Sequence, residues 1–174
     1  MNNEPAATTG GIRASEAPGY VWRFQDLAVY RKARALAKTV FEASRSFPRD
    51  EAYSLTDQVR RASRSIGAQL AEAWAKRRYP RHFASKLTDA DGEQLETQHW
   101  LVVAFDAGYL AETETRRLGG LCLEVGRMLG EMIAKADQFC RPSQPGLHEE
   151  PAPYAADPDG FPLDPLPSDT LMHR

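Results

Sequence analysis

Apolar side chains recur every three or four positions across residues 55–74, and this spacing constrains the fold more than any other feature of the chain. The apolar set is Leu55, Val59, Ala62, Ile66, Leu70 and Ala73. Successive residues of an α-helix are rotated by about 100°, so this set forms one stripe, and Arg60, Arg61 and Arg64 lie roughly opposite it. The spacing therefore predicts a helix that buries one face and presents a cationic one.

The composition is that of a soluble globular protein with one domain. Of the 174 residues, 42% are hydrophobic and 26% are charged, and both fractions are ordinary. The longest apolar run, residues 100–105, is far shorter than the ~18 residues of a membrane span, so we expect a cytoplasmic protein without a membrane partner. Cys122 and Cys140 would lie ~27 Å apart along one helix, which is too far for a disulfide.

Opposite charges are concentrated in different halves of the chain. Residues 24–82 contain thirteen Lys or Arg and six Asp or Glu, whereas residues 83–140 contain five and ten. Two interpretations are open. The halves complement each other, within a monomer or across an oligomer, or the basic half leaves part of its surface to an anionic polymer.

The chain divides into three parts. We expect residues 1–22 to be a disordered arm, residues 23–140 to fold, and residues 141–174 to be an acidic tail. The tail holds eight of the twelve prolines, and proline cannot donate the hydrogen bond that a helix interior needs. We predict a solvated tail; the alternative is a short docking segment around Phe161, Leu163, Leu166 and Leu171.

Four helices account for the folded part. The first is expected over residues 26–46, with Phe41 in its buried stripe. The second begins at Ser54, an N-cap that Asp57 completes as a capping box, and ends near residue 78. The third begins at Pro80 and buries Leu95, and a left-handed glycine at position 108 ends it. The fourth starts at residue 111 or 113 and ends at residue 139.

Short turns between helices of this length force neighbours to run in opposite directions. The predicted fold class is therefore all-α, an antiparallel up-down-up-down four-helix bundle. No alternating pattern of useful length indicates a sheet.

Ordered blocks of residues across positions 24–140 match a known pattern: Phe24, Asp26, Leu27, Val29 and Ala33; Phe47-Pro48, Glu51 and Tyr53; Leu55 and Gln58-Val59-Arg60-Arg61-Ala62; Ser65-Ile66 and Ala71-Glu72; Phe83; Leu95-Glu96-Thr97; and Gly108-Tyr109-Leu110. In these blocks the chain resembles a known family, the four helix bundle proteins also called 23S rRNA intervening sequence proteins. Two blocks depart from the family pattern, at residues 67–73 and at residues 90–91.

The resemblance implies partners as well as a fold. The family is similar to the accessory protein of diversity-generating retroelements, which resembles a pentameric barrel and binds nucleic acid and a reverse transcriptase. It therefore implies a homopentamer and an RNA or DNA partner, with a reverse transcriptase or another protein as a further partner.

The arginines of the second helix have three interpretations. Guanidinium groups match phosphate oxygens, so Arg60, Arg61 and Arg64 are candidates for binding nucleic acid. Asp57 has the spacing to pair with Arg60 and Arg61 within the helix. The third interpretation is an interface in which these arginines meet the acidic helices of a neighbouring protomer.

A denser basic cluster lies where the second helix turns into the third. It consists of Lys76, Arg77, Arg78 and Arg81, with Tyr79 and His82 interleaved. Cations beside aromatic planes can grip a nucleic-acid backbone and stack a base. The alternative is that cations are simply favoured at a helix C-terminus.

Enzymatic motifs are incomplete. Glu96 and His99 have the Glu-x-x-His spacing of di-iron bundles, but no second such pair exists. Residues 89–92 fail the calcium-loop pattern, and no nucleophile motif or phosphate-binding glycine loop is present. We therefore expect no catalytic residue, metal or cofactor. The sequence predicts a non-enzymatic oligomer that binds nucleic acid, structured RNA rather than DNA, by charge through a basic surface. The alternative is an oligomeric scaffold or an adaptor for proteins.

Overall fold

The computed structural model describes residue 21 and residues 23–140, and in this part the predicted four-helix architecture is confirmed. The elements are η1 (Phe24–Asp26), α1 (Ala28–Ala43), η2 (Ser44–Ser46), η3 (Arg49–Glu51), α2 (Leu55–Ala75), α3 (Pro80–Asp106), α4 (Glu112–Ala134) and α5 (Ala136–Cys140). The expected arm, except residue 21, and the expected tail lie outside the described residues.

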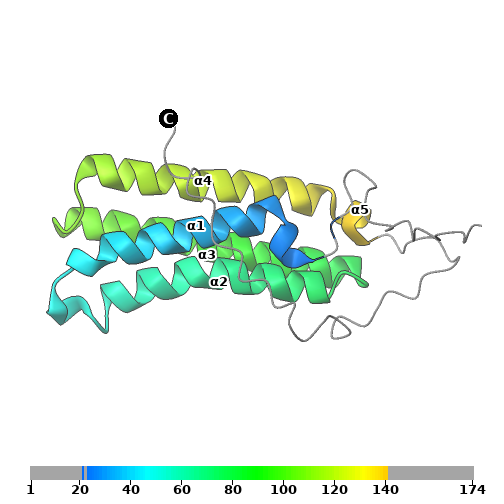
Figure 1. Ribbon diagram of the computed structural model, residues 1–174, viewed down its shortest axis with the longest axis horizontal. Coiled ribbons are helices and arrows are strands. Elements are labelled where there is room, and N and C mark those ends of the chain that lie inside the picture. Colours follow the sequence, from blue (N-terminus) through cyan, green and yellow to red (C-terminus); the bar gives the residue numbers. More distant parts are fainter. Residues whose placement is uncertain (1–20, 22, 141–174) are drawn as a thin grey trace, which may run out of the picture.

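The four long helices lie side by side with alternating directions (Figure 1). The principal packing pairs are α1 with α2, α2 with α3, α3 with α4, and α4 with α1. The bundle is therefore four-sided, and its α1–α2 side is opposite its α3–α4 side. The α1–α2 and α3–α4 connections lie at one end, and η1, the α2–α3 connection and α5 lie at the other.

The core is formed by the stripes that the sequence predicts. All six members of the α2 stripe are at most 4% exposed, and each of the other long helices contributes a matching row. The fully buried set includes Leu36, Val40, Phe83, Leu87, Leu118, Val125 and Leu129. Among the described residues, every helix is too short or too polar to span a lipid bilayer.

Two side chains expected in the core are not there. Phe41 is 40% exposed and Leu95 is 57% exposed. On α3 the buried positions beside Leu95 are occupied by Gln94 and Thr97, which are 2% and 0% exposed. The α3 hydroxyl of Thr97 is satisfied by donating to the Glu93 carbonyl at 2.8 Å. The expectation for Leu95 failed because α3 carries apolar residues on two faces, so hydropathy alone does not identify the side of α3 that faces the core.

The start of α2 differs from the predicted capping box. Ser54 occupies the N-cap position, but its side chain caps no backbone N–H. Instead the Glu51 carboxylate accepts hydrogen bonds from the Ser54 hydroxyl, from the Leu55 backbone N–H at 3.3 Å and from the Tyr109 hydroxyl at 3.3 Å. These bonds lower the pKa of Glu51, with the Ser54 bond as the largest cause. The cap thus joins the two connections at this end of the bundle.

The remaining helix ends are close to their predicted positions. The helix α3 begins at Pro80, and Gly108 adopts a φ of 74°, which is the left-handed stop that the sequence predicts. The helix α2 ends at Ala75, so residues 76–78 form a turn rather than its last part. The predicted fourth helix is interrupted at Lys135, and α5 forms its last five residues.

Candidate nucleic-acid interface

The three arginines of α2 point in two directions. Arg60 follows the fully buried Val59, so it lies only ~100° from the centre of the apolar stripe and is half-buried against α1. Arg64 is exposed on the same side. Arg61 projects away from α1 and pairs with Asp57 at 3.8 Å, which is the intrahelical pair that the sequence allowed. The structure therefore brings Arg60 and Arg64 together and separates Arg61 from them.

Phe41 of α1 is the side chain around which Arg60 and Arg64 gather. The Arg60 guanidinium carbon lies 4.8 Å from the centre of the Phe41 ring, and that of Arg64 lies 5.8 Å from it. The Arg60 Nε also donates a hydrogen bond to the Ser44 hydroxyl at 2.7 Å. Cations close to an aromatic ring are attracted by its negative face. This attraction explains why a large apolar side chain remains 40% exposed on α1.

Three further cations on α1 and η2, absent from the predicted site, extend this surface. Arg34, Lys38 and Arg45 are exposed and share the outer face of α1 and η2 with Phe41, at spacings of three, four or seven residues. We call these three, together with Arg60 and Arg64, the α1–α2 basic face. Among the described residues, none of its five members forms an ion pair with a carboxylate. The signal that could have found Arg34 and Lys38 is the run of four cations over residues 31–38, together with the helical spacing that aligns these two with Phe41.

The predicted cluster at residues 76–81 forms a separate surface at the other end of α2. Lys76 is about 24 Å from Arg60 along the helix axis, at 1.5 Å per residue. Arg77 packs on Trp74, with its guanidinium carbon 4.6 Å from the ring centre, whereas Arg78 and Arg81 are exposed.

Aromatic rings accompany these cations. The Tyr79 side chain is 63% exposed, and its ring centre lies 5.7 Å from that of His82. We call the four cations and two rings together the α2–α3 basic corner: Lys76, Arg77, Arg78, Tyr79, Arg81 and His82. It has the exposed ring and the cations that the sequence predicts for nucleic-acid binding.

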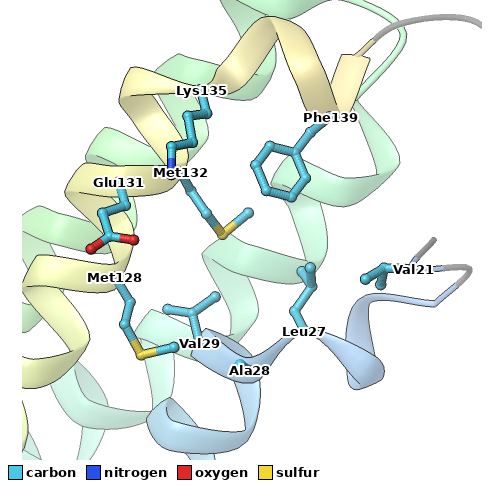
Figure 2. Close-up of a pocket in the computed structure, with 9 residues that line it drawn as sticks. All are labelled: Val21, Leu27, Ala28, Val29, Met128, Glu131, Met132, Lys135 and Phe139. Carbon is cyan, nitrogen blue, oxygen red and sulfur yellow. The ribbon is translucent and has the colours of Figure 1, made fainter. Parts of the chain in front are cut away.

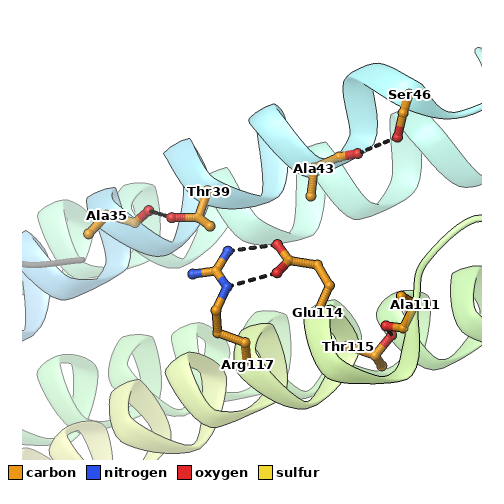
Figure 3. A network of polar contacts seen from close by, with 8 residues as sticks. All are labelled: Ala35, Thr39, Ala43, Ser46, Ala111, Glu114, Thr115 and Arg117. Atoms are coloured by element: carbon orange, nitrogen blue, oxygen red, sulfur yellow. Dashed lines mark hydrogen bonds and ion pairs between the residues drawn. The ribbon is translucent and has the colours of Figure 1, made fainter. Parts of the chain in front are cut away.

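Two adjacent arginines of α4 show the opposite arrangement. Figure 3 shows Arg117 forming a two-pronged pair with Glu114, at 2.6 and 2.8 Å, on the α4 side of α1. Arg116 makes the same kind of pair with Glu112, at 2.7 and 2.9 Å. The Glu114 pair raises the pKa of Arg117, with Glu42 of α1 contributing last. These two cations are therefore already neutralised, in contrast to those of the α1–α2 basic face.

A shallow apolar groove lies at the end of the bundle near α5 (Figure 2). Its volume is about 260 Å³, and its lining is Val21, Leu27, Ala28, Val29, Met128, Glu131, Met132, Lys135 and Phe139. Sites for small molecules generally have ~300 to 1,000 Å³ and several converging polar groups. The groove is therefore a poor candidate for a substrate or cofactor site.

The described residues also offer little for metal or thiol chemistry. Within residues 21 and 23–140, no three His, Cys, Asp or Glu side chains lie together as a metal site would require. The Glu96 carboxylate of the Glu-x-x-His pair accepts a hydrogen bond from the Trp100 indole at 3.0 Å. Burial raises the pKa of the Cys122 thiol to about 12, which suppresses the reactive thiolate.

The chain is similar to a known protein family and to a solved structure. The sequence model of the 23S rRNA-intervening sequence protein family matches residues 25–131, which include α1 and α2, α3 and most of α4. The crystal structure of a protein of unknown function from Bacteroides thetaiotaomicron, described as from the S23 ribosomal protein family, is similar with a TM-score of 0.56 and 22% identity. The match covers 61% of this chain and 95% of that chain, and it shows the shared fold. No curated protein matches, and neither description names a catalytic activity.

Proposed function

We propose that this protein is not an enzyme and that it binds the phosphate backbone of nucleic acid, RNA rather than DNA. The chain belongs to the 23S rRNA-intervening sequence protein family. The observation that carries the proposal is the α1–α2 basic face, whose five cations have no carboxylate partners among the described residues. Two of them, Arg60 and Arg64, lie over the exposed Phe41 ring. Unpaired cations repel one another, so an anionic ligand bound at this face stabilises the folded protein. The family name, which refers to an RNA, supports the choice of RNA.

The α2–α3 basic corner extends this proposed contact. It lies at the far end of the helix that supplies Arg60 and Arg64, so a nucleic acid lying along the α1–α2 side would reach both surfaces. The exposed ring of Tyr79 would stack an unpaired base, while Arg78 and Arg81 would hold the flanking phosphates. In this proposal Arg61 and Arg77, which are engaged by Asp57 and Trp74, have secondary roles.

Self-association is proposed on the opposite side of the bundle. Large apolar side chains are exposed on α3 and α4, where Leu95, Val102 and Leu123 are each more than half exposed and Phe105 is 40% exposed. Such side chains are usual at protein interfaces, whose centres are depleted of charge. A homo-oligomer that covers the α3–α4 side leaves the α1–α2 basic face outward. This side also supports the second candidate function, a scaffold that docks other proteins.

Salt dependence of RNA binding tests the proposal. Each neutralised phosphate contributes about −0.7 to −0.9 to the slope of log affinity against log salt, so five contacts give about −3.5 to −4.5. The affinity for a fluorescein-labelled hairpin RNA should then fall roughly 100- to 500-fold between about 50 and about 200 mM salt. Fluorescence anisotropy at several salt concentrations measures the affinity and therefore also the slope.

Two double variants with equal loss of charge separate a site from a general effect. Arg34→Gln with Lys38→Gln should make the slope shallower by about 1.4 to 1.8. Arg116→Gln with Arg117→Gln removes the same charge from paired positions and should leave the slope unchanged. An equal change of the salt slope in the two double variants would contradict a site on the α1–α2 side. Failure of the wild-type protein to bind RNA would favour the scaffold function.

A further inference from the structure

Arg60 differs from the other members of the α1–α2 basic face because its guanidinium is held in place. Its Nε donates to the Ser44 hydroxyl at 2.7 Å, and its guanidinium carbon lies over Phe41. An exposed arginine loses considerable side-chain entropy when it binds, because it must give up many rotamers. Arg60 has already given up this freedom in the folded protein.

The hydroxyl that holds Arg60 is itself fixed. Ser44 is 2% exposed and donates its own hydrogen to the Phe41 carbonyl at 3.1 Å. A serine hydroxyl has one hydrogen and two lone pairs, so this donation leaves a lone pair for the Arg60 Nε–H. The chain of bonds therefore runs from Arg60 through Ser44 to the backbone at the end of α1. It aligns the hydroxyl dipole so that its negative end faces the guanidinium.

The two terminal nitrogens of the Arg60 guanidinium are open to a ligand. A guanidinium carries five N–H donors, of which Ser44 uses one, and the other four are on the two terminal nitrogens. Among the described residues no acceptor bonds these nitrogens. The adjacent Arg64 guanidinium lies over the same ring, 5.8 Å from its centre. Two parallel N–H donors match two oxygens of one phosphate, and the second cation adds charge.

We propose that Arg60 is a pre-organised binding fork for a phosphodiester group, with Ser44 as the positioning residue and Phe41 as the support. The inference rests on the proposed nucleic-acid function and deepens it, because it assigns one phosphate contact to one residue. It also assigns a role to Ser44, which carries no charge and never meets the ligand. A surface that acts by charge density alone would be insensitive to such a residue.

Neutral and charge-conserving variants test this assignment in the full chain. Ser44→Ala retains every charge but frees Arg60, so the affinity for the labelled hairpin RNA should fall roughly three- to tenfold with the salt slope unchanged. Arg60→Lys keeps the charge but loses the fork and should weaken binding to a similar degree. Arg60→Gln should in addition make the slope shallower by about 0.7 to 0.9.

Ser46→Ala is the matched control. Its hydroxyl lies in the same 3-10 turn as Ser44 and donates to the Ala43 carbonyl at 3.0 Å (Figure 3). Among the described residues it forms no hydrogen bond with an arginine. This variant should bind RNA as the wild type does. Circular dichroism establishes that each variant is folded, and Arg60→Lys alone decides the outcome if Ser44→Ala unfolds.

The results distinguish this inference from the broader proposal. Wild-type affinity in both Ser44→Ala and Arg60→Lys, with binding still weakened by the Arg34 and Lys38 double variant, overturns the fork and leaves the proposed function intact. Absence of any salt-sensitive RNA binding by the wild-type protein overturns both. Weakened binding in Ser44→Ala and Arg60→Lys, with Ser46→Ala unaffected, supports both.

Discussion

Replacing Gly126 with alanine tests how tightly the buried amide of α3 packs against α4. A Cβ atom at position 126 would lie 2.8 Å from the Gln94 Oε1 and 3.3 Å from its Cδ. Gln94 is only 2% exposed, so its side chain has no solvent to swing into, and its Nε2 already lacks a hydrogen-bond partner among the described residues. The amide therefore occupies space that exists only because residue 126 is glycine.

The expected magnitude follows from two opposing terms. Alanine is favoured over glycine inside a helix by about 1 kcal/mol. Overpacking a buried site costs about 1 to 3 kcal/mol. Gly126→Ala should therefore change the free energy of unfolding by between about 0 and −2 kcal/mol. Gly119 lies in the same helix, and a Cβ there meets nothing within 4 Å, so Gly119→Ala should stabilise by about 0.5 to 1 kcal/mol.

Urea denaturation of the two variants measures the difference. A double variant with Gln94→Ala removes the overlapping amide, so the coupling energy between positions 94 and 126 should be about 1 to 3 kcal/mol in favour of the double variant. The reasoning is refuted if Gly126→Ala stabilises the protein as much as Gly119→Ala does.

Three further predictions concern the cap, the thiols and the apolar side of the bundle. Hydrogen bonds lower the pKa of Glu51, so its carboxylate stabilises the fold above the ordinary pKa of 4.5, and this contribution is lost as the pH falls through the lowered pKa. The melting temperature of Glu51→Gln should therefore decline less in acid than that of the wild type. Cys122, with a pKa of about 12, should resist iodoacetamide at neutral pH until urea unfolds the chain, and rapid native labelling would contradict its burial. Leu95→Gln with Leu123→Gln should lower the mass measured by light scattering, whereas an unchanged mass would place the contact elsewhere.

Helix positions were largely predictable because burial and helical spacing agree on α2 and α4. Agreement fails on α3, where Leu95 and Val102 face outward and Gln94 and Thr97 face inward. A polar residue in the core is explained only by its neighbours, here Gly126, and these are not adjacent in sequence. The same limit applies to the α2 cap, since Glu51 belongs to the preceding 3-10 turn and also bonds Tyr109, which is 58 positions later.

The candidate site was only partly predictable for a similar reason. Local clusters of charge identified Arg60 and Arg64, but their relation to Phe41 depends on how α1 packs against α2. Arg34 and Lys38 belong to a run of four cations over residues 31–38. Only the folded structure shows that the other two cations of this run are paired with carboxylates, whereas Arg34 and Lys38 are not, among the described residues. Ser44 has no charge and no motif, and only the folded geometry shows its contact with Arg60.

Lysine acetylation, measured by mass spectrometry with and without RNA, tests most directly whether phosphates bind the α1–α2 side. Lys38 lies on the α1–α2 basic face, Lys76 lies at the α2–α3 basic corner, and Lys135 is an exposed control at the end of α4. Bound RNA should lower the acetylation of Lys38 and Lys76 and leave that of Lys135 unchanged. Protection of Lys135 with Lys38 and Lys76 still fully reactive would contradict the account.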